Sequence, residues 1–198
     1  MIAWRGASRY LDEKFKPAFE MELAAMKAVK NDYGLDNLQL MVPFCRTPEE
    51  GEMVKDLLEE HGLGPSSGTD LFVMVELPSN VIEADRFIEM MELAGGSIGS
   101  NDLVQTVYAV SRDDLEGYQN PVDVDARSPS VKSMIREIVR KFNERGLEIG
   151  ICGQAPSDFP DEFPPFLIDC GITSISVTPD TAIAVRATVA EAEKNASS

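Results

Sequence analysis

The stretch of residues 71–102 constrains the fold more than any other part of the chain. Six of the seven residues at 71–77 are apolar, which is typical of a strand buried on both faces of a parallel sheet. Pro78 ends this strand, because proline has no N–H to donate to a neighbouring strand. Asn80 can then cap a helix that stops before a second short strand at 97–100. The stretch therefore predicts a strand–helix–strand unit.

Both predicted strands end on a carboxylate, Glu76 in the first and Asp102 in the second. Neighbouring parallel strands lie about 4.8 Å apart, so the two carboxylates would lie side by side at one edge of the sheet. Mg²⁺ binds about two carboxylates and leaves its other positions to water and substrate oxygens. The alternative is that each acid only caps the turn or helix that follows it. The sequence leaves both interpretations open.

The same alternation of strand and helix runs along the whole chain. Further strands are predicted at 37–44, 147–152 and 173–177, and the long segment 101–126 is predicted to be mostly irregular. Helices are predicted at 12–30, 47–62, 128–146, 163–169 and 180–194. Five repeats of strand and helix predict an α/β fold in which helices surround a parallel sheet.

Composition narrows the class of protein and its partners. A chain of 198 residues is long enough for one domain with a sizeable core. Its 34 acidic against 18 basic residues give a net charge of −16, which argues against nucleic acid or an anionic membrane as a partner. No apolar run approaches the roughly 20 residues that span a bilayer. Three cysteines without metal-binding spacing favour a reducing cytoplasm.

Active sites of parallel α/β folds gather where the strands end. The predicted strand ends bring metal ligands, an amide, a cation and a thiol to one rim, through Arg46, Glu76, Asn101, Asp102, Cys152 and Thr178. Cys152 is either a small buried residue or an acid/base thiol, which nearby carboxylates would keep protonated and suited to proton donation.

Three arginines in loop-like contexts, Arg5, Arg9 and Arg112, either bind phosphate or carboxylate groups or form surface salt bridges. The only histidine, His61, lies at a predicted helix end, where interaction with the helix dipole explains it better than catalysis.

Six segments in order along the chain resemble the phosphoenolpyruvate synthase family, in its C-terminal barrel that binds phosphoenolpyruvate (PEP) and pyruvate. They are WRGASRY (4–10), MVPFCRTPEE (41–50), VELPSNVIEAD (75–85), SIGSNDLVQ (97–105), GICGQAPSD (150–158) and SISVTPD (174–180). The resemblance implies a (β/α)8 TIM-type barrel of the PEP/pyruvate domain superfamily. It also implies a Mg²⁺ cofactor held by Glu76 and Asp102, and a catalytic Cys152 that exchanges a proton with the methylene carbon. The substrate-binding residues it implies are Arg5, Glu76, Ser100, Asn101, Asp102 and Arg112.

The chain departs from the family pattern in its extent. A complete barrel typically needs about 250 residues. With a short strand at 4–6, residues 1–198 would supply about the last six of eight units, as one partial barrel domain without the ATP-grasp and phosphohistidine domains. We therefore expect the C-terminal part of a cytoplasmic enzyme that transfers a phosphoryl group from a phosphohistidine domain, in cis or trans, to pyruvate enolate, and that is not active alone.

Two alternatives remain open at this stage. One is a non-catalytic module that keeps the PEP/pyruvate site, and the other is a stand-alone lyase of the same superfamily that performs enolate chemistry. In each case an open barrel exposes strand edges, which would favour a homo-oligomer or a complementing partner.

Overall fold

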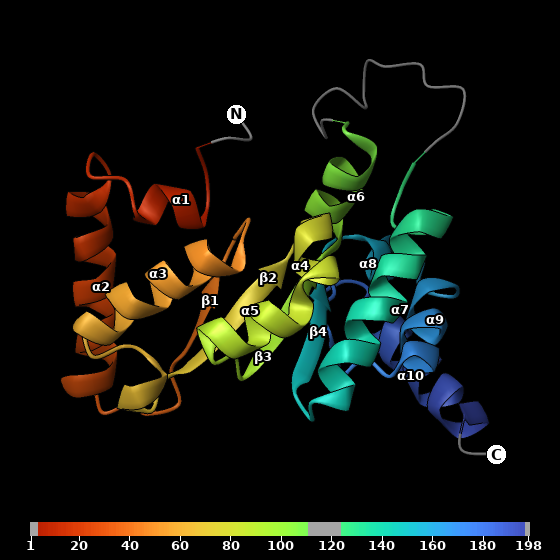
Figure 1. Ribbon diagram of the computed structural model, residues 1–198. Helices are drawn as coiled ribbons and strands as arrows, with labels where there is room; N and C mark the ends of the chain where they lie inside the picture. Colours follow the sequence, from red (N-terminus) through yellow and green to blue (C-terminus); the bar gives the residue numbers. More distant parts are fainter. Residues whose placement is uncertain (1–3, 111–123, 197–198) are drawn as a thin grey trace.

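The computed structural model describes residues 4–110 and 124–196 (Figure 1). Its strands form one five-stranded sheet in the order β1 (Gln39–Val42), β2 (Asp70–Val75), β3 (Gly95–Gly99), β4 (Glu148–Cys152) and β5 (Ser174–Ile175). Each strand pairs in parallel with the next strand along the chain. This uninterrupted order is that of a barrel wall, since doubly wound sheets reverse direction at a switch point. The predicted parallel α/β sheet is confirmed.

Helices precede, connect and follow the strands. They are α1 (Ala7–Tyr10), α2 (Lys16–Asn31), α3 (Pro48–Glu60), α4 (Pro78–Ile82), α5 (Ala84–Met91), α6 (Ser100–Tyr108), α7 (Pro129–Glu144), α8 (Ala155–Asp158), α9 (Phe163–Cys170) and α10 (Ala182–Ala196), with a 3-10 turn at Pro65–Ser67. Helix α3 begins as predicted, because Thr47 caps it by accepting the Glu50 N–H at 3.1 Å. No helix within the described ranges is both long and apolar enough to cross a membrane.

The two faces of the sheet differ in what covers them. One face lies under α3, α5 and α7 (Figure 1) and contributes to the hydrophobic core the buried residues Leu40, Val42, Leu71, Val73, Val75, Ile98, Ile149 and Ile151. On the opposite face Gln39, Met41 and Glu148 are exposed, and they help to line a hollow of about 350 Å³. Helices on one face and an open second face are the arrangement of a barrel wall.

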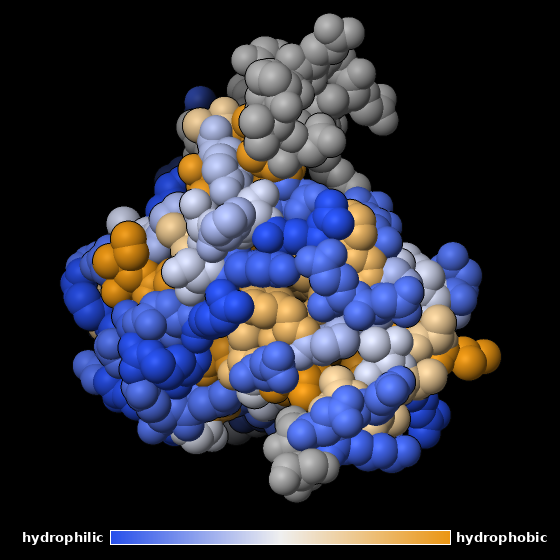
Figure 2. All heavy atoms as spheres, turned by 90° about the vertical axis from the view of Figure 1, so that its right-hand side faces the viewer, coloured by the Kyte–Doolittle hydropathy of each residue, from blue (hydrophilic) through white to orange (hydrophobic). Residues whose placement is uncertain are grey.

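The outer surface agrees with the acidic composition. Figure 2 shows the side of the molecule that is at the right in Figure 1, where α7, α9 and α10 lie. Hydrophilic side chains cover most of that face and surround a smaller apolar area. Such a surface is ordinary for a chain whose net charge is −16.

Two predictions about the chain around the strands need correction. The segment 101–126 was expected to be mostly irregular, but residues 101–108 belong to α6, whose Leu103 and Val104 are buried in the core, and residues 111–123 lie outside the described residues. Residues 4–6, expected to form a short strand, form bends and a turn in which Gly6 has a φ of 64°. A left-handed residue at Gly6 turns the chain rather than extending it.

The helix after β2 also differs from its prediction. Asn80 is not the N-cap residue but the third residue of α4, from where its side chain accepts the N–H of the N-cap residue Leu77, and the chain breaks at Glu83 before α5 begins. The second strand was expected at 97–100, but β3 begins two residues earlier and includes Gly95 and Gly96. At Gly95 a Cβ would lie 2.3 Å from Cε1 of Phe72, so this glycine is needed for close packing within the sheet.

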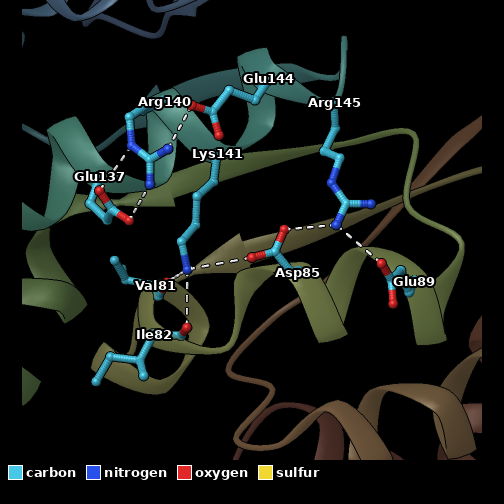
Figure 3. A network of polar contacts seen from close by, with 9 residues as sticks. All are labelled: Val81, Ile82, Asp85, Glu89, Glu137, Arg140, Lys141, Glu144 and Arg145. Carbon is cyan, nitrogen blue, oxygen red and sulfur yellow. Dashed lines mark hydrogen bonds and ion pairs between the residues drawn. The ribbon is translucent and has the colours of Figure 1, made fainter.

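A network of charged side chains joins α7 to α4 and α5 (Figure 3). Lys141 Nζ donates to the carbonyl oxygens of Val81 and Ile82, both at 3.1 Å, where α4 ends. Arg145 bonds to Asp85 at 2.8 Å and to Glu89 at 3.1 Å. Arg140 forms ion pairs of 2.6 Å with Glu137 and with Glu144 on its own helix. These contacts fasten the helix layer on the outer side of the sheet.

A candidate active site at the C-terminal edge of the sheet

Four of the residues predicted from the strand ends, Glu76, Asn101, Asp102 and Cys152, follow or end three consecutive strands. Glu76 directly follows β2, and Cys152 is the last residue of β4. Ser100, Asn101 and Asp102 make the first turn of α6, directly after β3 ends at Gly99. The prediction that Asp102 ends a strand is therefore wrong, although Asp102 does lie at the same edge of the sheet as Glu76.

Glu76 is a buried carboxylate, with only 4% of the residue exposed. Its Oε2 has no hydrogen-bond partner among the described residues. Burial and, to a smaller extent, the neighbouring charge of Asp102 raise the pKa of Glu76 to about 7, although Arg5 opposes the shift. At Gly99 a Cβ would lie 2.6 Å from Cγ of Glu76, so the glycine makes room for this side chain. Glu76 therefore lies where burial makes its ionised form unfavourable.

Asp102 lies at the more open side of the same site. Its Oδ1 is 2.9 Å from Nη1 of Arg5 and accepts a hydrogen bond from Nε2 of Gln105 at 3.2 Å. The Arg5 guanidinium also packs over the Phe44 ring, 4.2 Å from its centroid. The structure therefore brings together Glu76, Asp102 and Arg5, which the sequence analysis placed in one site.

Ser100, Asn101 and Cys152 form the other side of the edge. Ser100 is fully buried and donates from Oγ to the Cys152 carbonyl oxygen at 3.2 Å. Asn101 Oδ1 accepts from the backbone N–H of Gln154 at 3.5 Å. Cys152 pairs in register with Gly99, and its Sγ lies 3.8 Å from Sδ of Met74 on the open face of the sheet. The Cys152 thiol therefore lies on the same face of the sheet as the Glu76 side chain, which packs against Gly99.

Two further residues hold this edge in shape and were not predicted as site residues. Asn80 Oδ1 accepts the N–H groups of Glu76 and Leu77 at 3.1 and 3.0 Å, and its Nδ2 donates to Cys45 O at 2.7 Å. Thr106 Oγ1 lies 2.8 Å from the Glu76 carbonyl oxygen and joins α6 to the end of β2. The sequence marks Asn80 only as a possible helix cap after Pro78, and no sequence signal marks Thr106.

The contacts of three other polar or ionisable residues, Arg9, Cys45 and His61, are explained by packing or by helix ends. Arg9 packs its guanidinium over Phe15, 4.0 Å from the ring centroid, in the arm before α2. Cys45 is a buried packing residue, and burial raises the pKa of its thiol to about 12. His61 Nδ1 lies 2.8 Å from the carbonyl oxygen of Leu57 at the end of α3. Arg112 lies outside the described residues.

The donor set fits a hard divalent cation. Carboxylate oxygens are the ligands that Mg²⁺ prefers, and a cation would balance the unpartnered oxygen of Glu76 and the charge of Asp102. No group of three or more histidine, cysteine, aspartate and glutamate side chains able to hold a metal ion occurs in the parts of the chain that the structure describes. Two carboxylates with open positions suit Mg²⁺ better than Zn²⁺, whose sites use three or four protein ligands.

Comparison with known proteins points in one direction. Residues 1–194 match the family model described as PEP-utilising enzyme, PEP-binding domain. Over 196 residues the chain is 47% identical to phosphoenolpyruvate synthase of Aquifex aeolicus and 45% identical to that of Synechocystis, covering 98% of this chain and 22% and 23% of theirs. The Escherichia coli phosphoenolpyruvate synthase is 37% identical over 195 residues, which cover 98% of this chain and 24% of that enzyme. The chain therefore spans less than a quarter of the length of these relatives.

Solved structures resemble the fold at low sequence identity. An aldolase/citrate lyase family protein from Burkholderia cenocepacia has a TM-score of 0.52 at 19% identity, covering 88% of this chain and 69% of that protein. The citrate lyase beta subunit from M. tuberculosis, complexed with oxaloacetate and magnesium, has a TM-score of 0.51 at 14% identity, covering 76% and 60%. These similarities support a TIM-barrel-like fold.

Proposed function

Because the chain belongs to the PEP-utilising enzymes, by their PEP-binding domain, we propose that it is the PEP- and pyruvate-binding part of a phosphoenolpyruvate synthase. In this proposal residues 1–198 form one partial barrel domain. The phosphoryl group comes from a phosphohistidine domain charged by an ATP-grasp domain, on the same polypeptide or on another. The acceptor is the enolate oxygen of pyruvate, and the product is PEP.

The buried carboxylate of Glu76 carries the proposal. A buried acid whose pKa is raised to about 7 and whose Oε2 has no partner within the described residues destabilises the free protein. Such an arrangement is retained where a ligand supplies the missing charge. Mg²⁺ held by Glu76 and Asp102 would supply positive charge that stabilises the pyruvate enolate.

The chain's own residues have separate tasks in this proposal. Arg5 pairs with the anionic substrate, which it reaches from its position beside Asp102. Asn101 and the Ser100 backbone orient substrate oxygens at the start of α6. Cys152, at the end of β4 on the open face, takes a proton from the methyl carbon of pyruvate to form the enolate, and in the reverse direction returns it to the methylene carbon of the enolate after the phosphoryl group has left. Arg112 binds the phosphate group.

Calorimetric titration of oxalate, which mimics the pyruvate enolate, tests the proposal. We expect binding only in the presence of Mg²⁺, and at least about a hundredfold loss of affinity in Glu76→Gln and in Asp102→Asn. Asp85→Asn is the matched control, because Asp85 belongs to the network between α5 and α7. If a folded chain does not bind oxalate, or binds it equally well in all variants, the proposal is wrong.

A non-catalytic binding module would give the same titration result, so a second measurement separates the two. Cys152→Ala should bind oxalate normally but lose the exchange of pyruvate methyl protons with deuterated solvent. Exchange that persists in Cys152→Ala would remove the thiol from the mechanism. An unaltered chain that binds oxalate without exchanging protons would favour the binding module.

A further inference from the structure

The residues before α2 form an arm that carries Arg5 to the site. This arm, residues 4–11, lies against the loop that follows β1. Ala7 N–H donates to the Pro43 carbonyl oxygen at 3.1 Å. At Gly6 the φ is 64° and a Cβ would lie 2.4 Å from that same oxygen, so the two backbones touch directly. At its other end the arm is fixed by Tyr10, which stacks on Phe19 of α2 with ring centroids 4.3 Å apart.

Arg46 provides the side-chain link between the loop and the arm. Its Nη1 donates to the Arg5 carbonyl oxygen at 3.3 Å and to Ser8 Oγ at 2.9 Å. Glu50, in the first turn of α3, accepts the Arg46 backbone N–H at 2.6 Å and lies 3.6 Å from the Arg46 guanidinium. The carboxylate of Glu50 therefore orients Arg46, and Arg46 in turn grips the arm at the residue that reaches Asp102.

Phe44 lies between the two arginines. The guanidinium of Arg5 is 4.2 Å from the ring centroid and that of Arg46 is 5.1 Å from it. Phe44 is 2% exposed and has a φ of 47°, a left-handed conformation that a bulky residue adopts only where its surroundings impose it. The aromatic face favours both cations and limits where the Arg5 side chain can go.

We propose that Arg46 is a positioning residue, which clamps residues 4–11 to the loop after β1 and so holds the Arg5 guanidinium beside Asp102. The proposal rests on the proposed function, in which Arg5 binds the substrate. Arg46 acts through Arg5 and does not touch the ligand. An arginine suits this task, because its planar guanidinium packs over the Phe44 ring while Nη1 donates to the arm, whereas a lysine offers a single point of charge.

Hydrogen exchange measured by mass spectrometry tests the clamp without any ligand. In Arg46→Gln we expect the segment 4–11, with the Ala7 amide, to exchange about tenfold faster than in the unaltered chain. Arg46→Lys should fall between the two. Gly6→Ala should release the arm without any change at Arg46. The matched control is Arg140→Gln, which removes an arginine paired with two carboxylates on α7 and should leave this segment unchanged.

A double-mutant cycle on oxalate binding then tests whether Arg46 acts through Arg5. With Mg²⁺ present, Arg46→Gln should lower the affinity about tenfold in the unaltered chain and should add no further loss in Arg5→Gln. Urea unfolding of each variant confirms that it is folded. A loss of equal size in both backgrounds overturns the proposal, because Arg46 would then act independently of Arg5.

Unchanged exchange of segment 4–11 in a folded Arg46→Gln also overturns the proposal, because the arm would then be held without Arg46. If the unaltered chain binds no oxalate, the proposed function fails. The exchange experiment still decides whether Arg46 holds the arm, so the two failures are distinguishable.

Discussion

Two charged regions of this molecule use the same residue types in opposite ways. In the network between α5 and α7, arginines and a lysine meet carboxylates on an outer surface, and Arg140, Asp85, Glu89 and Arg145 have side chains between 41% and 64% exposed (Figure 3). At the C-terminal edge of the sheet, Glu76 is 4% exposed and keeps an oxygen without a partner among the described residues. The outer region satisfies its charges within the chain, whereas at the edge of the sheet Asp102 is paired with Arg5 but one oxygen of Glu76 is not paired within the described residues.

The difference separates charges that the fold itself satisfies from the one that a ligand would satisfy in the proposed function. Exposed ion pairs cost little and contribute little, since water already solvates each partner. A buried and unpaired carboxylate lowers stability, and folding alone gives no reason to keep it. Pairing and burial, rather than residue type, therefore distinguish Glu76 from the acids of α5 and α7.

The largest effect that tests the contrast between Glu76 and the outer acids is expected in the pH dependence of the free energy of unfolding, measured without metal. The pKa of Glu76 is raised from 4.5 to about 7 in the folded chain, so the folded chain holds a proton that the unfolded chain has released. Stability should therefore fall as pH rises from 5 to 8, by about 2.5 kcal/mol. Urea unfolding in the presence of a chelator measures it. In Glu76→Gln this fall should be absent, and parallel curves for the two chains would contradict the assignment.

The next test moves Glu76 without altering its charge. In Gly99→Ala the new methyl group would lie 2.6 Å from Cγ of Glu76, so the carboxylate must shift. We expect a loss of about 1–2 kcal/mol in stability and about a tenfold loss of Mg²⁺-dependent oxalate affinity. Calorimetry and urea unfolding measure the two effects. Ser97→Ala, on the same strand, is the control and should preserve affinity.

On the outer side, the largest effect is expected at Lys141. Its side chain is only 14% exposed, and Lys141→Met leaves the carbonyl oxygens of Val81 and Ile82 without this donor. Stability should drop by about 1–2 kcal/mol, while oxalate affinity stays the same. A fall in affinity would break the contrast, because the outer layer would then set the geometry of the site.

The smallest effect is expected at Arg140, whose side chain is 52% exposed. Arg140→Gln removes two ion pairs within α7, and stability should change by no more than about 0.5 kcal/mol. Raising the salt concentration to about 1 M should shrink that difference further, because salt screens exposed pairs. A change above about 1 kcal/mol would show that the network is more than a solvated surface.

Sequence reasoning succeeded where local signals coincide. The apolar run before Glu76 and the proline after it mark the end of β2, and the ends of parallel strands share one edge. It failed for α6, because Val104, Thr106 and Val107 are β-branched and lower helix propensity. The burial of Leu103 and Val104 against the core outweighs that preference. Tertiary packing, which no local pattern reveals, therefore decided the shape of the segment that holds Asp102.

The clamp at Arg46 could not be predicted for another reason. Its partners are a backbone carbonyl and a serine hydroxyl, 41 and 38 positions away in the sequence. Every residue has a carbonyl and serines are common, so residue type gives no sign of the contact. Only the path of the arm past Gly6 brings these groups together.

The consecutive order of the strands has a consequence for how the chain folds. Parallel neighbours cannot be joined by a tight hairpin, so each strand must wait for a crossover connection before it pairs. Five of the ten helices and three of the five strands that the described residues form lie between Arg5 and Asp102 in the sequence. Contacts between residues this far apart in the sequence form late in folding and lower the folding rate. A chain halted before its final compaction would have most of its helices and no site, so ligand affinity measures the completion of folding.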